Sequence, residues 1–220
     1  MDTRAIVFDF DGLILDTETS IYTSWQRVFD EHASGPLTIE EWSAEIGTIG
    51  GLDVIALLQS RANGSLDIDA IQTARRAHRD ALLAAESVRP GIVDWLDAAR
   101  VLDLGIAIAS SSEREWVEPH LLRLGLRDRF GHLACADAVV AAKPAPDTYL
   151  AACAALGLSP RDAIAVEDSP AGIEAALAAG LRVVAVPNAV TAQLDVSAAD
   201  LVLPSLAACS LADALERLAR

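Results

Sequence analysis

Two carboxylates lie two residues apart near the start of the chain, in the segment 9–12 with sequence Asp-Phe-Asp-Gly. The apolar run 6–8 precedes them and predicts a short strand that ends at Asp9. Because residues i and i+2 of a strand point to the same side, Asp11 would lie over the same point as Asp9. Neighbouring carboxylates raise each other's pKa, and a divalent cation such as Mg²⁺ relieves their repulsion. One carboxylate could then attack a substrate while the other transfers protons. Solvated acids at a strand end are the alternative interpretation of this segment alone.

Three further polar segments each follow an apolar, strand-like run, at 106–109, 141–142 and 163–166. They bring a pair of hydroxyls, an ammonium group and a second pair of acids. Ligands of open parallel α/β sheets bind at the carboxyl ends of the strands, so we expect these groups to converge near Asp9 and Asp11. The polar residues in question are Ser110 and Ser111, Lys143, and Glu167 and Asp168.

Lys143 is the only lysine among the 17 basic residues of the chain; the other 16 are arginines. An arginine side chain is a planar fork, whereas a lysine ammonium is a compact point charge. Because a solvated surface accepts either residue, the single lysine favours a specific role for its ammonium group.

Together the four segments resemble the motifs of the haloacid dehalogenase-like (HAD) hydrolases. The similar subgroup includes sugar-phosphate and phosphoglycolate phosphatases and beta-phosphoglucomutase. The matching stretches are 9–17, 110–111, 143–147 and 167–172, in the order and spacing of the family, and the resemblance covers nearly the whole chain. It implies an α/β fold, with a Rossmann-like parallel-sheet core and an inserted all-helical cap domain.

The resemblance also implies an activity, namely Mg²⁺-dependent hydrolysis of a small phosphorylated metabolite, such as a sugar phosphate. Asp9 would be the nucleophile that forms an aspartyl-phosphate, and Asp11 would be the acid and base. The metal would be held by the Asp9 and Asp168 carboxylates and the Asp11 backbone carbonyl, with Glu167 on a metal-bound water. The substrate phosphoryl group would meet the Ser110 hydroxyl, the Lys143 ammonium and backbone amides near Gly12 and Ser111.

Two alternatives remain open within this fold. A beta-phosphoglucomutase needs cations in the cap to hold a second phosphate, and the cap loop 46–51, which we expect to face the site, contains none. This favours hydrolysis over mutase-type phosphoryl transfer. A non-catalytic phosphate-binding protein would not require Asp9 and Asp11 together with Lys143 and Asp168.

Helical patterns fill the region after the first strand, starting at Asp16 and Thr17 and continuing to about residue 86. From residue 88 onward, helices alternate with apolar strands, which predicts a parallel sheet. We therefore expect a core of residues 1–15 and 88–220 and a cap of residues 16–87 joined by two hinges. Ser112 with Glu115 predicts a capping box, and Ser169 before Pro170 predicts another helix start.

Composition narrows the class of partner. The 220 residues carry a net charge of −15, which argues against nucleic acid and anionic membranes as partners. We find no membrane-length apolar run and no signal segment, and three cysteines without metal spacing fit a reducing compartment. These features predict a cytoplasmic protein, by default a monomer. For Trp116 we consider a substrate contact. Glu18 lies near the hinge, where it could face the site, but a solvated first-turn carboxylate is favoured, and Arg79 is expected on a solvated helix face.

Overall fold

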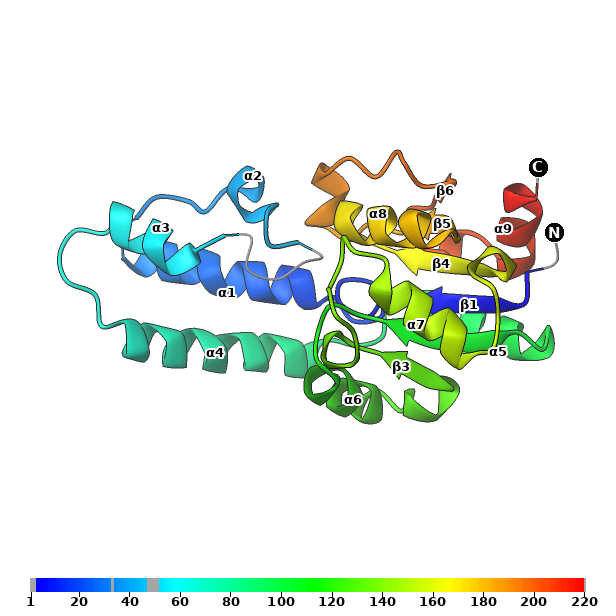
Figure 1. Cartoon of the computed structure of the whole chain (residues 1–220). Coiled ribbons are helices and arrows are strands. Elements are labelled where there is room, and N and C mark those ends of the chain that lie inside the picture. Colours follow the sequence, from blue (N-terminus) through cyan, green and yellow to red (C-terminus); the bar gives the residue numbers. More distant parts are fainter. Residues whose placement is uncertain (1–2, 33, 47–51, 220) are drawn as a thin grey trace.

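The computed structural model describes residues 3–32, 34–46 and 52–219 (Figure 1). The strands are β1 (Ala5–Phe8), β2 (Gly105–Ala109), β3 (His132–Ala134), β4 (Ala163–Glu167), β5 (Arg182–Ala185) and β6 (Leu201–Val202). The first four helices are α1 (Thr17–Glu31), α2 (Ile39–Trp42), α3 (Val54–Arg61) and α4 (Ile68–Ala85). The others are α5 (Ile92–Val101), α6 (Arg114–Arg123), α7 (Asp147–Ala155), α8 (Pro170–Ala179) and α9 (Leu211–Leu218).

The six strands form one parallel sheet in the order β3-β2-β1-β4-β5-β6. The central strand β1 pairs with β2 and β4, and Ile6 is in register with Ile106 and Ile164. Because all strands run in the same direction, their carboxyl ends share one edge of the sheet. The predicted α/β class with a Rossmann-like parallel core is thus confirmed.

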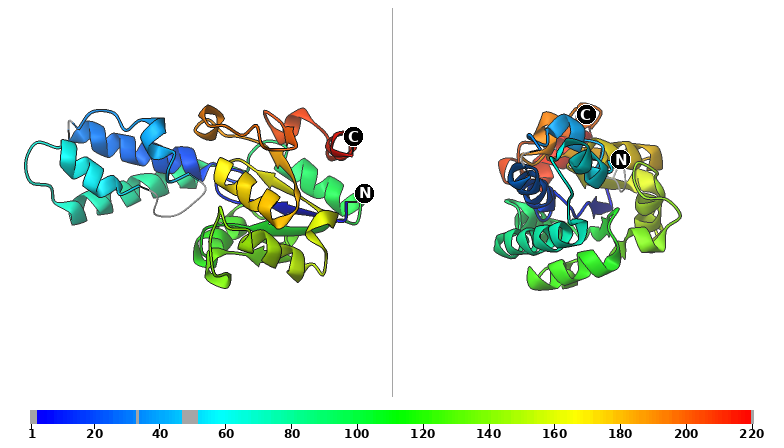
Figure 2. Two further views of the ribbon diagram at one scale, coloured as in Figure 1. Left: turned by 45° about the horizontal axis from the view of Figure 1, so that its top comes forward. Right: turned by 90° about the vertical axis from the view of Figure 1, so that its left-hand side faces the viewer.

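Helices cover both faces of the sheet, which explains why β1 is apolar at every position. Ala5 and Val7 face the side covered by α7 and α8. Ile6 and Phe8 face the opposite side, where α5, α6 and α9 pack (Figures 1 and 2). This alternation fixes the register of β1 and therefore the place where Asp9 leaves the sheet.

One predicted strand is wrong. The run 141–142 before Lys143 is not a strand; the third strand is β3, and Lys143 lies in the loop between β3 and α7. Val140 beside this run is 100% exposed, so the segment does not bury the apolar surface that holds a strand in a two-sided sheet.

Helices α1–α4 lie beyond the carboxyl edge of the sheet and surround a separate apolar cluster that includes Trp25, Phe29 and Leu58 (Figures 1 and 2). Asp16 caps α1 as predicted, because its side chain accepts from the Thr19 backbone N–H at 3.0 Å. Helices α1 and α4 lie side by side (Figure 1). Within the described ranges, no helix combines the length and the apolar composition needed to cross a membrane.

Two chain segments connect this helical region to the sheet, and they are bonded to each other. The backbone N–H of Arg89 donates to Ile14 O at 3.0 Å. The Arg89 guanidinium also donates to the carbonyls of Gly12 and Pro187. The two connections therefore lie together beside the end of β1, close to the acidic segment 9–12.

Candidate active site

Asp9 leaves the carboxyl end of β1 at the centre of the sheet. Its backbone N–H donates to Val166 O of β4 at 2.9 Å, and the residue is 5% exposed. Burial raises the pKa of the Asp9 carboxyl; the Lys143 ammonium opposes this rise, and the charge of Glu167 adds to it. Asp9 is therefore a carboxylate whose charge depends on a nearby cation.

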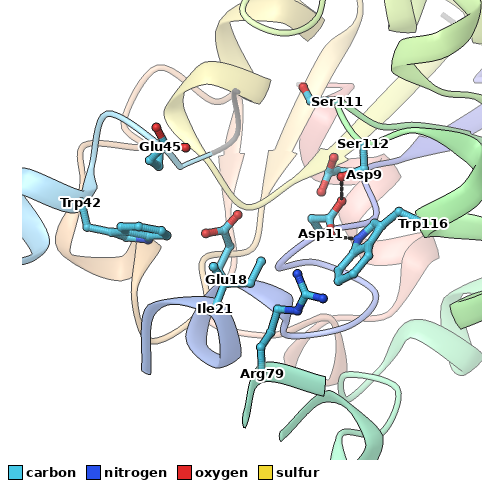
Figure 3. Close-up of a pocket in the computed structure, with 10 residues that line it drawn as sticks. All are labelled: Asp9, Asp11, Glu18, Ile21, Trp42, Glu45, Arg79, Ser111, Ser112 and Trp116. Carbon is cyan, nitrogen blue, oxygen red and sulfur yellow. Dashed lines mark hydrogen bonds between the residues drawn. The ribbon is translucent and has the colours of Figure 1, made fainter. Parts of the chain in front are cut away.

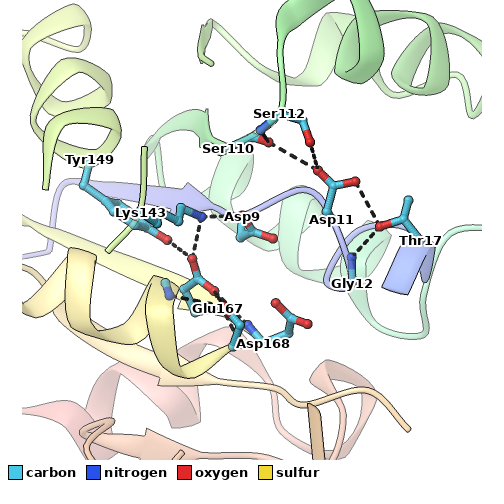
Figure 4. A network of polar contacts seen from close by, with 12 residues as sticks. Asp9, Asp11, Gly12, Thr17, Ser110, Ser112, Lys143, Tyr149, Glu167 and Asp168 are labelled. Carbon is cyan, nitrogen blue, oxygen red and sulfur yellow. Dashed lines mark hydrogen bonds and ion pairs between the residues drawn. The ribbon is translucent and has the colours of Figure 1, made fainter. Parts of the chain in front are cut away.

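Lys143 supplies one such cation. Its Nζ donates to Asp9 Oδ1 and, at 2.6 Å, to Glu167 Oε1, in a site where the lysine is 2% exposed (Figure 4). Burial alone would lower the pKa of Lys143, but the charges of Asp9 and Glu167 outweigh it and raise the pKa. The Tyr149 hydroxyl on α7 donates to the same Glu167 oxygen at 2.6 Å. The ammonium group is thus held in its charged form between two carboxylates.

Three buried carboxylates, on Asp9, Glu167 and Asp168, each offer an oxygen, and these oxygens lie within 4.8 Å of one another. Burial raises the pKa of Asp168, and the charges of Asp9 and Glu167 raise it further. Asn188 Nδ2 donates to Asp168 Oδ2 at 2.7 Å and orients that carboxylate. A cluster of oxygen donors with mutually unfavourable charges fits a hard divalent cation such as Mg²⁺.

Two glycines leave room for these carboxylates. A Cβ on Gly12, which has φ +78°, would lie 2.3 Å from Asp168 Oδ2. A Cβ on Gly172, in the first turns of α8, would lie 2.0 Å from Glu167 Oε1. Ser169 caps α8 by accepting from the Gly172 N–H at 3.1 Å, as predicted. The packing therefore explains why glycine stands at both positions.

Asp11 lies on the other side of Asp9, and its carboxylate is turned toward the serine loop after β2 (Figure 4). Each of its oxygens accepts two hydrogen bonds. The donors to Oδ1 are Thr17 Oγ1 at 2.9 Å and Trp116 Nε1 at 2.8 Å. The donors to Oδ2 are Ser112 Oγ at 2.7 Å and Ser110 Oγ at 3.3 Å. The Asp11 side chain is thus outside the three-carboxylate cluster.

The capping box predicted from Ser112 and Glu115 is wrong. Helix α6 has Glu113 at its N-cap, without a side-chain capping bond. The Ser112 hydroxyl donates to Asp11 Oδ2 at 2.7 Å. The sequence signature was therefore that of a site residue.

A cavity of about 240 Å³ opens between this edge of the sheet and the helical region (Figure 3). One wall comes from the segments after β1 and β2, and the other from α1, α4 and the segment around α2. The residues that line the cavity are Asp9, Asp11, Glu18, Ile21, Trp42, Glu45, Arg79, Ser111, Ser112 and Trp116.

Glu18 and Trp42 are the most buried side chains on the helical wall. Burial raises the pKa of Glu18 to about 8, and the charges of Asp11 and Asp9 contribute to the rise. The Trp42 indole N–H opposes part of this rise in pKa. Its Nε1 is buried and has no hydrogen-bond partner of ordinary geometry among the described residues. This wall therefore offers a buried carboxyl with a raised pKa and a buried indole N–H.

The structure brings together most of the residues singled out from the sequence. Asp9, Lys143, Glu167 and Asp168 form one cluster, and Asp11 and the serine loop lie beside it. The Gly12 N–H points elsewhere, to Leu15 O and Thr17 Oγ1. Of the predicted cap loop, residues 47–51 lie outside the described residues.

Other residues of the site were not found from the sequence. Arg79 lines the cavity, contrary to the expectation of a solvated face, and Glu18 lines it as in the alternative to its favoured solvated position. Tyr149 and Asn188 bond Glu167 and Asp168, but no sequence pattern marks them. Thr17 stands in the resembling stretch 9–17 and was the one missed partner that the sequence pointed to.

Comparisons with known proteins agree with this geometry. A sequence model described as haloacid dehalogenase-like hydrolase matches residues 6–186. YhcW of Bacillus subtilis is 41% identical over 98% of this chain and 97% of its own length. The fructose-1-phosphate phosphatase YqaB of Escherichia coli is 31% identical over 81% of this chain and 94% of its own length.

The same relationship is found among solved structures. CbbY from Rhodobacter sphaeroides, crystallised in complex with phosphate, is 32% identical with a TM-score of 0.74. The similarity covers 96% of this chain and 98% of that one. A mutant of CbbY, crystallised in complex with xylulose-(1,5)bisphosphate, matches equally well. With its parallel sheet, its acidic cluster and a sequence match over most of its length, the chain belongs to the haloacid dehalogenase-like hydrolases.

Proposed function

We propose that this hydrolase is a Mg²⁺-dependent phosphatase that acts on a sugar phosphate or a similar small phosphorylated metabolite through an aspartyl-phosphate on Asp9. The observation that carries the proposal is the shared position of Asp9, the Lys143 ammonium and an oxygen-only cluster at one edge of the sheet. The names of YqaB and of the CbbY complex, which refer to sugar phosphates, support this substrate class.

The metal would be held by the carboxylates of Asp9 and Asp168 and the backbone carbonyl of Asp11, with Glu167 nearby. When bound, Mg²⁺ supplies positive charge that shields the nucleophile from the anionic substrate and stabilises the equatorial oxygens of the transferring phosphoryl group. Asp9 and Asp168 both have raised pKa values through burial, and a cation would favour their ionised forms.

In the first half of the reaction, an Asp9 carboxylate oxygen attacks phosphorus. The bond between phosphorus and the leaving oxygen breaks, and Asp11 gives its proton to that oxygen. In the second half, Asp11 takes a proton from water as the water oxygen attacks phosphorus. Asp9 is then released as a carboxylate together with inorganic phosphate.

Fixed donors around Asp9 would stabilise the charge on the phosphoryl oxygens. Lys143 contacts Asp9 directly, and the further donors would be the Ser110 hydroxyl, which lies 3.3 Å from Asp11 Oδ2, and the Ser111 amide. Gly12 would contribute space rather than a donor, because its N–H is already bonded and its missing Cβ makes room for Asp168.

Residues 16–87 would act as a cap that closes over the cavity and selects the substrate. The buried Glu18 carboxyl, protonated near neutral pH, can both donate and accept hydrogen bonds. Among the residues that the structure describes, the Trp42 N–H has no acceptor of ordinary geometry. Hydroxyl groups of a sugar satisfy both requirements, which supports a polyhydroxylated substrate.

The net charge of −15 and three free cysteines support a cytoplasmic protein, which we propose to be a monomer.

Phosphate release from a panel of sugar phosphates, phosphoglycolate and nucleotides tests the proposal. We expect release with Mg²⁺, none with EDTA, and a loss of at least about a hundredfold in Asp9→Asn, since the nucleophile is removed. Asp94→Asn, an exposed carboxylate in the first turn of α5, is the matched control and should retain wild-type turnover.

The same panel decides between the alternatives. Beta-glucose 1-phosphate with a bisphosphate primer would be isomerised by a mutase with little phosphate release. A folded protein that binds Mg²⁺ and phosphate esters without any turnover would instead be a binding protein, and the catalytic roles of Asp9 and Asp11 would be wrong.

A further inference from the structure

One hydrogen bond to Asp11 differs in kind from the other three. The indole Nε1 of Trp116 donates to Oδ1 at 2.8 Å, whereas the remaining donors are hydroxyl groups (Figures 3 and 4). Those hydroxyls belong to Thr17 on Oδ1 and to Ser110 and Ser112 on Oδ2. A hydroxyl can turn from donating to accepting, but an indole N–H can only donate.

This difference separates the two oxygens of Asp11. The indole N–H cannot accept a proton from Oδ1, so of the two partners of this oxygen only the Thr17 hydroxyl could accept one, and that hydroxyl already accepts from the Gly12 N–H at 3.1 Å. Oδ2 has only hydroxyl partners in the described residues, and these can turn to accommodate a proton. Oδ2 therefore accommodates a proton more readily than Oδ1.

The orientation of the indole is set by contacts from two parts of the fold. Trp116 stands in the first turn of α6, and His120 of the same helix packs edge-on to its ring with centroids 4.7 Å apart. Phe10, from the segment 9–12, packs against His120 at 6.1 Å. From the helical region, Arg79 of α4 places its guanidinium 5.1 Å from the centre of the indole ring. An ion pair with Asp80 at 2.7 Å holds this guanidinium.

We propose that Trp116 is a positioning residue for Asp11, and that Arg79 holds the indole in place from α4. Trp116 reserves Oδ1, so that Oδ2 delivers the proton as the bond from phosphorus to the leaving oxygen breaks. Because Arg79 belongs to the proposed cap, the position of α4 controls the orientation of the acid. The inference rests on the proposed role of Asp11 as the general acid.

Two aryl esters of matched size test this role. The 4-nitrophenolate group leaves phosphorus with little need for a proton, whereas phenolate depends on the general acid. The measured quantity is kcat/KM for phenyl phosphate and 4-nitrophenyl phosphate, which reports the steps up to loss of the phenol and excludes later hydrolysis of the aspartyl-phosphate. Trp116→Phe keeps the ring but removes the N–H. We expect it to lower kcat/KM about tenfold for phenyl phosphate and no more than about twofold for the nitrophenyl ester.

Arg79→Gln should change the ratio of the kcat/KM values for the two esters in the same direction as Trp116→Phe, but only by about threefold. The smaller change is expected because the indole N–H remains while the ring is held less firmly. Arg79→Lys keeps a cation over the ring and should restore the wild-type ratio. The chain offers a matched control in Arg75, whose guanidinium lies 4.6 Å from the centre of the Trp25 ring, away from Asp11. Trp25→Phe and Arg75→Gln should retain the wild-type ratio.

An equal loss of kcat/KM for both esters in Trp116→Phe, or no loss for either ester, would overturn the inference. Circular dichroism shows whether Trp116→Phe is folded; if it is not, the half-buried Arg79→Gln and its lysine counterpart carry the test. Asp11→Asn separates this inference from the proposed function. If the ratio of kcat/KM for the two esters changes in Asp11→Asn but not in Trp116→Phe, only the positioning role is refuted. If the ratio is unchanged in Asp11→Asn, the role of Asp11 as the acid is itself refuted.

Discussion

Lys143 donates from Nζ to Glu167 Oε1 at 2.6 Å, and neither side chain is more than 2% exposed. The same ammonium also contacts Asp9, so one buried cation is shared by two carboxylates. Removing one partner from a buried ion pair leaves an uncompensated charge, which is far more damaging than loss of a surface pair. The position of Asp9 and the stability of this edge of the sheet therefore depend on the same lysine.

Lys143→Met tests this dependence. It leaves Asp9 and Glu167 buried without their cation, and we expect the free energy of unfolding in EDTA to fall by about 3–5 kcal/mol. Phosphate release with Mg²⁺ should fall by at least about a hundredfold, because a donor to the transferring phosphoryl group is lost. Urea unfolding and initial rates measure the two effects.

Arg61→Met is the matched control, since it also removes one cation from an ion pair. Arg61 pairs with Glu41 in the helical region, where the side chains are 29% and 28% exposed. Its loss should lower stability by about 1 kcal/mol or less. Equal destabilisation by the two variants would contradict a special role for the buried lysine.

Magnesium should stabilise the folded protein measurably. The oxygen cluster of Asp9, Glu167 and Asp168 forms only in the folded state, so a bound ion favours that state. At a concentration of about 100 Kd, the stabilisation is about 2.7 kcal/mol. For a chain of this size, that corresponds to a rise in Tm of about 5–10 °C. Differential scanning fluorimetry with EDTA and with increasing Mg²⁺ measures it.

Asp168→Asn should abolish most of the rise in Tm with Mg²⁺, because it removes the negative charge of a carboxylate that would bind the metal. Asp94→Asn should leave the rise in Tm intact. A rise in Tm that is the same in Asp168→Asn would place the metal outside this cluster. The readout does not require turnover, so it tests the metal site separately from the reaction.

The acidic half of the site could be predicted from the sequence because strand ends fix it. Asp9, Glu167 and Asp168 directly follow or end apolar runs that form β1 and β4, and parallel pairing brings these ends together. Lys143 was predicted at the same edge, although the strand expected before it does not exist. The loop after β3 still reaches the cluster, because the carboxyl end of β3 lies at the same edge of the parallel sheet as the carboxyl ends of β1 and β4.

Contacts that depend on how helices pack could not be predicted. Arg79 reaches Trp116 only because α4 lies beside α1 at the end of the sheet, and helical spacing alone cannot state that. Tyr149 is one apolar position among others on α7, and its bond to Glu167 becomes evident only from the packing of α7 on the sheet. Side-chain partners across elements therefore required the structure.

Gly172→Ala should damage the site even though alanine favours helices. The added Cβ would lie 2.0 Å from Glu167 Oε1, so the carboxylate that pairs with Lys143 must move. Overpacking of this kind costs about 1–3 kcal/mol, which exceeds the helix propensity gained. Gly131→Ala is the control, because its Cβ would lie 3.6 Å from the nearest atom, Ile106 O. If both variants keep wild-type stability and turnover, Glu167 is not confined as the packing indicates.

Glu18→Gln should change how stability depends on pH. The pKa of Glu18 rises from 4.5 to about 8 in the folded protein, mainly through burial, so between these values the folded state keeps a proton that the unfolded state has lost. Stability contributed by the protonated form is therefore lost as the pH rises from about 5 to 8. Glutamine does not titrate, so the variant should gain stability relative to wild type over this window, by no more than about 5 kcal/mol.

The measurement is the Tm of both proteins in EDTA at pH 5, 6.5 and 8. Asp9 and Asp168 also have raised pKa values, but they are present in both proteins, so their effects largely cancel in the difference. At pH 5 the two Tm values should lie closest together, because this pH is only about half a unit above the ordinary pKa of 4.5 and little of the linked stability has been lost. Parallel Tm curves from pH 5 to pH 8 would show that Glu18 ionises in the folded protein as it does in water. The hydrogen-bonding role proposed for its protonated carboxyl toward a sugar would then be wrong.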